Sequence, residues 1–565
     1  MLRFVSPDPT PTTIGVLPGA YLVGKDNVAI AGEVTVRDGI VICEKGTTEA
    51  AALAVQITLG QERLNQLGTD TTIEGVTLKP LGTWTLQTCL LPEREKPYLL
   101  VMELARHRIM SFLTKLEDWQ AIESTEDTLP MRLFEAARTT FVQALVHAHE
   151  SILPDSQAAN LALRALWIAL EASERLALQQ AERDFPIRAD GSLYEQIEQE
   201  PTDPEKRKPI LHPGRGGVIL PLKPAVGTLV SPHVFAPMTQ EAITNACDFI
   251  NVPMRWIEME PAEGEYDYTK TDRWIEWAIR QAKVPVVAGP LVDFRSTSVP
   301  DWLYIWENDY ETLRELVYEH IKTLVTRYRR TITRWTVCSG LHCGEQFKLS
   351  FEQMMDLTRI CVLVTRKLHP RAKIQVEITQ PWGEYHTHDR TSLPPLLYAE
   401  MLSQAGIHID AFSLRMQMGS YRPGLQTRDL LAFSAMLDQY AMLDRPITIS
   451  SLGVPTTEIT PRNDLPDQPE TGTWRQPWNE DSQADWLSAY GAVALSKPYI
   501  ESICWHELAD TSGSSDMRSG GLMDIKGNPR PSLDRLSDLR IAIAESKLPE
   551  SWSADTILST KPDPV

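Results

Sequence analysis

The pattern of apolar and polar residues changes twice along the chain, and each change indicates a different kind of structure. Between residue 12 and about residue 95, apolar and polar residues alternate between turns rich in Gly, Asp and Asn, as in "AYLVGKDNVAIAGEVTVRDGIVICEKG". A period of two residues is typical of strands with one buried face. The pattern therefore predicts a β-rich, sandwich-like domain over residues 1–96.

A helical period follows the β-like region. It begins with "PYLLVMELARHRIMSFLTKLEDW" (97–119) and continues over residues 131–150 and from residue 156 to about residue 183. Apolar residues at this spacing predict a helical connector over residues 97–187. The next segment, "RADGSLYEQIEQEPTDPEKRKP", is polar and contains Pro, so it predicts a linker over residues 188–209.

The longest part of the chain alternates short apolar runs with helical segments. Examples are the strand-like runs "VPVVAGPLVDF", "AKIQVEIT" and "RPITISSLGVP" and the helical segment "YETLRELVYEHIKTLVTRY". Strand–helix alternation over roughly 300 residues predicts a parallel α/β domain, and the length suits a (β/α)8 TIM barrel. We assign the barrel to residues 210–545 and a tail to residues 546–565.

The charge balance narrows the classes of partner. Hydrophobic residues make up 42% and charged residues 23% of the chain, which is typical of a globular protein. The 75 acidic residues against 55 basic ones give a net charge of −20. This balance argues against a nucleic-acid partner, because binding to a phosphate backbone needs a basic face. The net negative charge is compatible with a neutral ligand, and it also has a simpler explanation in the solubility of the protein.

The cysteines and the first residues bear on location. The start, "MLRFVSPDPTPTTIG", lacks the basic and apolar segments of a secretory signal, and no run of about 18 apolar residues predicts a membrane span. The seven cysteines are odd in number and scattered, mostly within apolar runs, which favours reduced, buried thiols over disulfides. We expect a cytoplasmic protein without a membrane partner, although a chain that had lost its signal peptide would look the same.

Several short motifs in the barrel region occur in a fixed order. They are "NVPMRWIEMEPAEGEYDYTKTDRWIEWA" (251–278), "VPDWLY" (299–304), "HIKTLVTRYRRTITRWTV" (320–337), "AGIHIDAFSLRMQM" (405–418) and "GGLMDIKGNPRPSLDRL" (520–536). In this order and spacing the region resembles glycoside hydrolase family 10, the endo-β-1,4-xylanase family. The resemblance implies a (β/α)8 barrel that acts on β-linked oligo- or polysaccharides, and it does not extend to the first 200 residues.

The resemblance also implies where the catalytic residues would lie. Retaining glycosidases use two carboxyl groups about 5 Å apart, one as proton donor and one as nucleophile. The family's donor motif W-D-V-V-N-E falls on residues 335–340, so that its Asn-Glu is replaced by Ser339 and Gly340. Its nucleophile motif I-T-E-L places the glutamate at Ser451. Glycine has no titratable group and serine is a poor nucleophile without a base, so the retaining mechanism is predicted to be lost.

Other carboxylates at predicted strand ends are candidates for a relocated catalytic pair. They are Glu377 and Glu507, with Asp293 in reserve. Glu377 and Glu507 follow the predicted fifth and eighth strands, and a wide separation would suit an inverting mechanism, which needs room for a water. The alternative is that each carboxylate pairs with a cation such as Arg415 and only supports the barrel.

Three tryptophans are candidates for sugar binding. Trp505 matches a position where the family has a tryptophan that stacks on sugar, and Trp382 follows the fifth predicted strand. Trp256 is part of the frame that the resemblance preserves. An apolar ring face with a polar tip suits carbohydrate, whereas the alternative for each tryptophan is packing in the core.

Two arginines and a glutamine, which are candidates for substrate binding, replace other polar residues of the family. Arg255 replaces a lysine, Arg415 replaces a glutamine and Gln417 replaces a histidine. Two arginines would suit an acidic ligand such as a uronate, but they would equally well pair with Glu377 or Asp293.

The sequence predicts no metal and no cofactor. The segment "YHTHD" (385–389) places His386 and His388 two residues apart, with His342 and Cys343 elsewhere, and no spacing here brings three or four ligands together. There is no G-x-S-x-G elbow and no phosphate-binding G-x-x-x-x-G-K-[ST] loop.

Three functional hypotheses follow. In the first, the chain is a carbohydrate-active protein of xylanase-like descent that binds a β-linked glycan or oligosaccharide at the barrel mouth without retaining hydrolysis. In the second, it is an active glycoside hydrolase that uses Glu377 and Glu507. In the third, the barrel is a non-catalytic structural or assembly scaffold.

Overall fold

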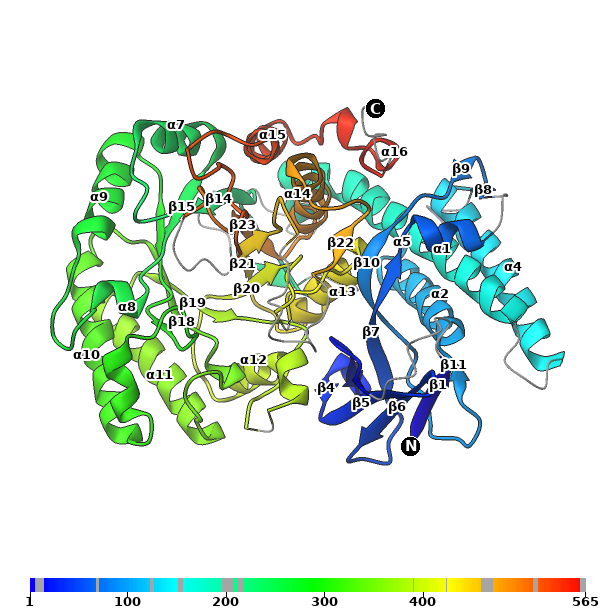
Figure 1. Cartoon of the computed structure of the whole chain (residues 1–565). Coiled ribbons are helices and arrows are strands. Elements are labelled where there is room, and N and C mark those ends of the chain that lie inside the picture. Colours follow the sequence, from blue (N-terminus) through cyan, green and yellow to red (C-terminus); the bar gives the residue numbers. More distant parts are fainter. Residues whose placement is uncertain are drawn as a thin grey trace.

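A computed structural model describes most of the chain. The described residues are 1–5, 15–67, 71–121, 127–150, 156–195, 208–211, 217–389, 391–422, 424–458, 471–511 and 517–558. Part of the predicted linker (196–207) and the end of the predicted tail (559–565) lie outside them. The N-terminal β-structure and its helices lie on one side of a barrel (Figure 1). Within the described residues, no helix is both long and apolar enough to span a bilayer.

The N-terminal region contains two five-stranded sheets. The first has the order β11-β1-β6-β5-β2, with β1 (Leu2–Val5), β2 (Gly15–Val16), β5 (Gly32–Arg37), β6 (Ile40–Lys45) and β11 (Tyr98–Leu99). The second has the order β22-β10-β7-β3-β4, with β3 (Tyr21–Val23), β4 (Ala29–Ile30), β7 (Ala52–Leu59), β10 (Gly82–Gln87) and β22 (Thr473–Trp474). Fully buried and less buried positions alternate along the first four residues of β6, as expected for a strand with one buried face. A short helix, α1 (Gln61–Gln66), and the hairpin of β8 (Thr72–Ile73) and β9 (Val76–Thr77) complete this region.

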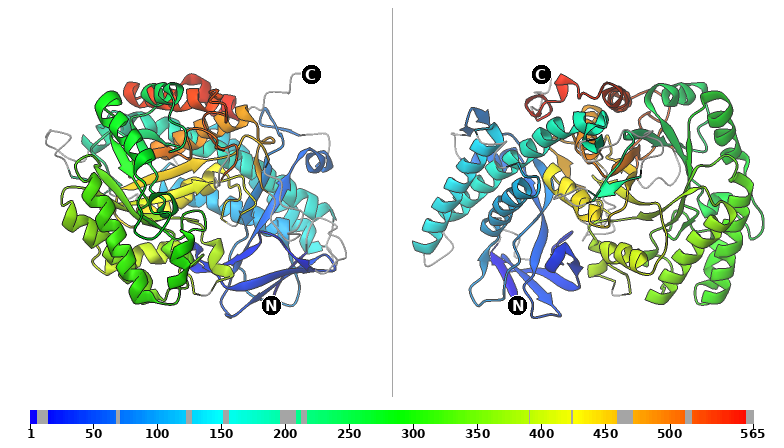
Figure 2. Two further views of the ribbon diagram at one scale, coloured as in Figure 1. Left: turned by 60° about the vertical axis from the view of Figure 1, so that its left-hand side comes forward. Right: turned by 180° about the vertical axis from the view of Figure 1, so that it is seen from behind.

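The predicted helical stretches form three long helices. They are α2 (Leu100–Asp118), α4 (Leu129–Glu150) and α5 (Ser156–Ala189), followed by the short α6 (Ser192–Glu195). Helix α5 is buried on nearly all sides from residue 165 to residue 178, because it packs between α2 and α4 on one side and the barrel on the other. Burial on all sides is typical of such a central position, and the charged residues Glu171, Glu174 and Arg175 within this stretch are buried with it. Figure 2 shows these helices alongside the barrel.

The rest of the chain is a closed barrel of parallel strands. Its strands are β14 (Ala225–Leu229), β15 (Phe249–Val252), β16 (Val286–Ala288), β17 (Val292–Asp293), β18 (Arg334–Ser339), β19 (Lys373–Ile378), β20 (Ala411–Gln417), β21 (Ile447–Gly453) and β23 (Ile500–Trp505). The short β16 and β17 share the third position, since both pair with β18, and the pairing of β14 with β23 closes the ring. The predicted (β/α)8 TIM barrel is therefore confirmed.

A helix follows each strand position on the outside of the barrel. These helices are α7 (Pro237–Ala246), α9 (Thr269–Trp277), α10 (Tyr310–Tyr328), α11 (Phe351–Leu368), α12 (Pro395–Gln404), α13 (Leu430–Ala441), α14 (Glu480–Leu495) and α15 (Pro531–Glu545). Polar side chains cap four of them by accepting a hydrogen bond from a backbone N–H of the first turn: Asp309, Ser350, Asp429 and Asn479. The chain then ends in the short turns Glu550–Trp552 and Ala554–Ile557.

The motif "EMEPAEGEY" has a structural role at the second strand. The Glu260 carboxylate accepts hydrogen bonds from Trp256 Nε1 (2.8 Å) and from the backbone N–H of Gly264 (2.9 Å), and it lies 3.1 Å from His320 Nδ1. The His320 ring stacks on Trp256 at 4.1 Å between centroids. One buried carboxylate thus fixes the loop after β15, the short helix α8 (Trp256–Met259) and helix α10 relative to one another.

Candidate functional site

The candidate site lies where the barrel strands end. Asp293, Ser339, Glu377 and Ser413 are register neighbours on β17, β18, β19 and β20. Register neighbours in a parallel sheet point to the same side, so polar groups from successive strands meet inside the barrel. The structure therefore brings two of the three predicted carboxylates, Asp293 and Glu377, to the same level of the barrel.

Glu377 is buried and bonded on both oxygens. Its side chain is 2% exposed; Ser339 Oγ donates to Oε1 at 2.6 Å, and Ser450 Oγ donates to Oε2. Arg415 Nε lies 3.3 Å from Oε1 and supplies the balancing charge. A buried carboxylate needs hydrogen-bond donors and a balancing charge, and these three partners supply both. The pairing of Arg415 with Glu377 is the arrangement that the sequence left open as an alternative to catalysis.

Asp293 is held in a similar way. Arg295 donates from Nε to Oδ1 at 2.9 Å and from Nη2 to Oδ2 at 2.5 Å, and Ser298 Oγ donates to Oδ2 at 2.7 Å. Burial by itself would raise the pKa of Asp293, but the Arg295 guanidinium and these hydrogen bonds outweigh it and hold the pKa below its ordinary value. Asp293 is therefore an ionised, structurally paired carboxylate.

Glu507 lies after β23, near a polar network that includes Ser451. Gln417 Nε2 donates to Ser451 Oγ at 2.8 Å and to His506 Nδ1 at 2.5 Å. Glu507 accepts a hydrogen bond from Ser231 Oγ at 3.0 Å, and its other oxygen lies 3.9 Å from His506 Nε2. Because His506 Nδ1 already accepts from Gln417, it is poorly placed to take a proton from Ser451, which lies 3.5 Å away.

Gly340 is a turn residue with a special backbone conformation. Its φ of 67° lies in the left-handed region, and the chain passes from β18 into the short turn Leu341–Cys343 at this point. A Cβ at this position would lie 3.5 Å from Thr379 Oγ1, which is ordinary contact. The requirement for glycine is therefore in the backbone and not in the available space.

The three candidate tryptophans differ in their surroundings. Trp505 is 1% exposed, and its Nε1 donates to the carbonyl of Gly520 at 2.9 Å. Trp256 is also buried and packs against His320 as described above. Trp382 is partly buried, with the guanidinium of Arg428 5.1 Å from its ring centre. A role for these rings in sugar binding stays a prediction.

Arg255 is the more accessible of the two candidate arginines. Its side chain is 25% exposed and its Nη1 lies 3.5 Å from Glu258 Oε1. His233, from the loop after β14, approaches the same Glu258 oxygen at 3.7 Å. These three side chains form a polar group on the rim of the barrel, beside the second strand.

The histidines considered as metal ligands have different surroundings. His342 is buried, stacks on Tyr398 at 5.0 Å, and has Nε2 3.1 Å from the carbonyl of Thr379. His386 Nδ1 lies 3.0 Å from Ser392 Oγ, and His388 is exposed. In the part of the chain that the structure describes, no three His, Cys, Asp or Glu side chains are arranged to hold a metal ion.

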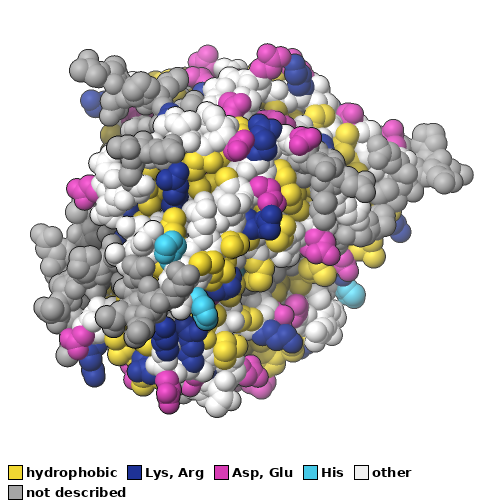
Figure 3. All heavy atoms as spheres, turned by 90° about the vertical axis from the view of Figure 1, so that its right-hand side faces the viewer, with side chains coloured by type: hydrophobic (Ala, Val, Ile, Leu, Met, Phe, Trp, Pro, Cys, Tyr) yellow, Lys and Arg dark blue, Asp and Glu magenta, His cyan; other side chains and the backbone are white. Residues whose placement is uncertain are grey.

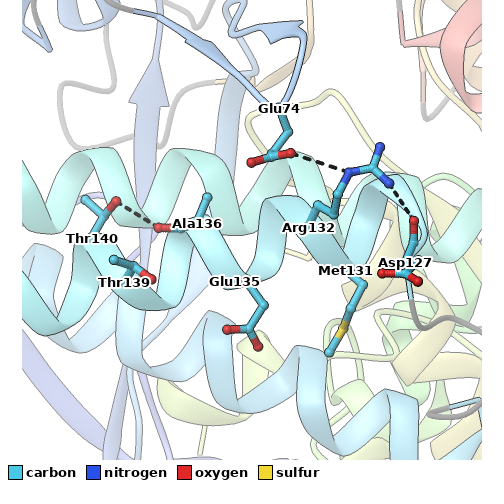
Figure 4. A pocket seen from close by; sticks show the side chains of 8 residues that line it. All are labelled: Glu74, Asp127, Met131, Arg132, Glu135, Ala136, Thr139 and Thr140. Atoms are coloured by element: carbon cyan, nitrogen blue, oxygen red, sulfur yellow. Dashed lines mark hydrogen bonds and ion pairs between the residues drawn. The ribbon is translucent and has the colours of Figure 1, made fainter.

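A surface hollow of about 630 Å³ lies elsewhere, between Glu74 of the β8–β9 hairpin and helix α4 (Figure 4). Arg132 bridges Glu74 at 3.4 Å, and the hollow continues along α4 to Thr140. It lies in the N-terminal region, whereas the candidate site residues lie in the barrel.

The serine partners of the carboxylates, and Arg295 beside Asp293, were not predicted from the sequence. Ser450, Ser298 and Ser231 each donate to a predicted carboxylate, and Arg295 pairs with Asp293. The sequence contains a pattern that could have indicated them, because "VDFRSTS" and "TISS" put polar residues directly after apolar strand residues.

Comparisons with known proteins find similar solved structures and one matching family. The xylanase 10B of Thermotoga maritima is 16% identical, with a TM-score of 0.44 over 57% of this chain and 97% of that one. The xylanase 10B of Thermotoga petrophila RKU-1 in complex with xylobiose is also 16% identical (TM-score 0.43; 57% and 95%). The xylanase 10C of Cellvibrio japonicus in complex with xylopentaose is 15% identical (TM-score 0.43; 57% and 68%). The model of glycosyl hydrolase family 10 matches residues 224–536, which is more than half of the chain. The chain therefore belongs to glycosyl hydrolase family 10.

Proposed function

We propose that this chain is a carbohydrate-active member of family 10 that binds a β-linked glycan or oligosaccharide at the barrel mouth and has lost the family's retaining hydrolysis. One observation carries the proposal. The positions that resemble those of the two catalytic glutamates hold Gly340 and Ser451, and neither side chain supplies a carboxyl group. A double displacement needs one carboxyl as proton donor and another as nucleophile.

The nearby carboxylates are poor replacements in their present state. A general acid must come within hydrogen-bond reach of the group that it protonates, whereas both oxygens of the buried Glu377 are already bonded to Arg415, Ser339 and Ser450. Two further strands, β20 and β21, separate Glu377 on β19 from Glu507 after β23. An active hydrolase that uses this pair would have to release Glu377 from its three partners first.

The rim of the mouth offers groups suited to a sugar. Arg255 presents a partly exposed guanidinium beside Glu258, and Trp382 presents a partly buried ring. A guanidinium donates several hydrogen bonds in one plane, to hydroxyls or to the carboxylate of a uronate. These groups would bind a glycan without protonating a leaving group.

A structural scaffold is the second candidate function. It is favoured by the burial of Trp505, whose ring is covered and whose Nε1 is bonded to the backbone of Gly520. A sugar platform presents a ring face to the ligand, and Trp505 would have to be uncovered before it could do so.

The cytoplasmic location also stays a proposal. All seven cysteines are buried free thiols, in agreement with the expectation from the sequence. Thiols persist in reducing compartments, whereas exported proteins more often carry disulfides.

Calorimetric titration with neutral and uronate-bearing xylo-oligosaccharides tests the proposed binding. We expect saturable binding to the native chain and a loss of about tenfold for Arg255→Ala, because a charged hydrogen bond is worth about 1.5 kcal/mol or more. Arg138→Ala is the matched control, since Arg138 forms a similar i,i+3 pair with Glu135 on the distant helix α4. Absence of binding to every oligosaccharide tested would contradict the proposed glycan binding and favour the scaffold function.

A further inference from the structure

The N-terminal region contacts the barrel through buried charged groups. We propose that the barrel face formed by α13 and by the loops after β19, β20 and β21 is an interaction surface whose partner is the chain's own first 195 residues, and that the two parts fold and unfold as one unit. The inference is independent of the proposed glycan binding. It concerns the role of the region that lies outside the family match at residues 224–536.

Helix α2 is attached to α13 at two points. At the first, Arg108 forms a two-pronged pair with Asp429, from Nη1 to Oδ1 at 2.8 Å and from Nη2 to Oδ2 at 2.6 Å. At the second, Asp438 accepts hydrogen bonds from Lys115 Nζ at 3.1 Å and from Trp119 Nε1 at 3.2 Å. Asp429 is fully buried and also caps α13. The same carboxylate thus begins a barrel helix and holds an N-terminal one.

Helix α5 reaches the start of α13 and the loop after β21. Glu174 Oε1 accepts a hydrogen bond from the backbone N–H of Leu430 at 2.7 Å, and Oε2 accepts one from Trp474 Nε1 at 3.0 Å. The neighbouring Glu171 accepts one from Arg475 Nη2 at 2.9 Å. Glu171, Glu174 and Arg475 are all buried, so these hydrogen bonds lie inside the contact between the two parts of the chain.

The second N-terminal sheet includes a strand from the barrel. Strand β22, in the connection between β21 and α14, pairs antiparallel with β10 through Gly82–Trp474 and Thr83–Thr473. A Cβ at Gly82 would lie 2.3 Å from the carbonyl of Thr473, and the φ of Gly82 is +100°, so glycine is required for this close approach. The backbone N–H of Thr85 also donates to the carbonyl of Thr427 at 2.9 Å.

The first N-terminal strands extend the contact to the loop after β19. Tyr21 Oη accepts a hydrogen bond from Arg428 Nη2 at 3.1 Å, and the same guanidinium pairs with Glu384. The N-terminal region therefore supports three successive loops, and these loops follow the strands that hold Glu377, Gln417 and Ser451.

The energetics favour one unit over two separable domains. A single cluster of buried apolar side chains runs through both parts, and separation would expose to water the portion that lies between α5 and the barrel helices α13 and α14. It would also break the pair of Arg108 with Asp429 and the hydrogen bonds that Glu171 and Glu174 accept from the barrel. By contrast, the opposite side of the N-terminal region shows apolar side chains interspersed with charges of both signs (Figure 3). The buried charged face is the one turned toward the barrel.

Cutting the chain tests the inference directly. A protease site is introduced between residues 195 and 208 of the full chain, and the cut protein is analysed by size-exclusion chromatography and by thermal unfolding. We expect both fragments to elute together at the mass of the intact chain and to unfold in one transition, as in the uncut protein. Elution of the fragments as separate species, or a second transition from a barrel that stays folded alone, would overturn the inference.

Two matched substitutions on α2 test the role of the buried charges in the cut protein. Arg108→Met should raise the dissociation constant of the fragments by at least about 100-fold, because it leaves Asp429 buried without its cation. Arg106→Met should raise it by less than about threefold, because Arg106 is more exposed and pairs with Glu103 of its own helix. Equal effects of the two changes would show that the ion pair with Asp429 does not hold the parts together.

Discussion

Replacing Arg415 by methionine would leave the Glu377 carboxylate buried without its cation. The pair is formed at 3.3 Å between side chains that are 12% and 2% exposed. Breaking such a pair by removing one partner costs about 3–5 kcal/mol. With an unfolding entropy of about 2.1 cal/mol/K per residue, a single unit of 565 residues would lose about 3–4 °C in Tm. Differential scanning calorimetry of the native chain and of Arg415→Met at neutral pH measures this loss.

The double variant Arg415→Met, Glu377→Gln serves as the control. It removes both charges and keeps groups that bond to Ser339 and Ser450, so it should recover part of the lost stability. A loss below about 1 kcal/mol for Arg415→Met would refute the assignment of this pair as buried and charge-balanced.

Three further predictions concern stability. Gly340→Ala should lower the stability by about 1–2 kcal/mol because of the positive φ, measured by urea unfolding, whereas Gly46→Ala should change it little; equal effects would contradict the backbone argument. Asp293→Asn should be most destabilising at neutral pH and progressively less so below pH 4, because the depressed pKa contributes stability that is lost as the carboxyl is protonated. Burial raises the pKa of Glu174 to about 7, so this carboxyl contributes stability that is lost as the pH rises from 4.5 to 7; the difference in stability between the native chain and Glu174→Gln should therefore change over that range, and a difference that does not vary with pH would contradict the raised pKa.

The sequence predicted the barrel because its strands are short apolar runs that alternate with amphipathic helices. It also placed Asp293, Glu377 and Glu507 at strand ends, where the structure has them. It did not predict β22, since two residues cannot show a period of two and their partner strand lies about 390 residues away in sequence.

The partners of the carboxylates were harder to predict for a physical reason. Ser450 donates to Glu377 while the adjacent Ser451 accepts from Gln417, although neighbouring residues of a regular strand point to opposite faces. The register of β21 shifts beside Leu414 and Arg415 and again after Ile449. Such an irregularity lets both serines contact groups inside the barrel, and the apolar pattern gives no sign of it.

The loss of hydrolysis is tested most directly by measuring the release of reducing ends from β-linked xylo-oligosaccharides. The native chain should show no turnover above the level of the Glu377→Gln, Glu507→Gln double variant, while it still binds the same oligosaccharides in the calorimeter. Turnover by the native chain that either single substitution abolishes would contradict the account and would identify Glu377 or Glu507 as catalytic.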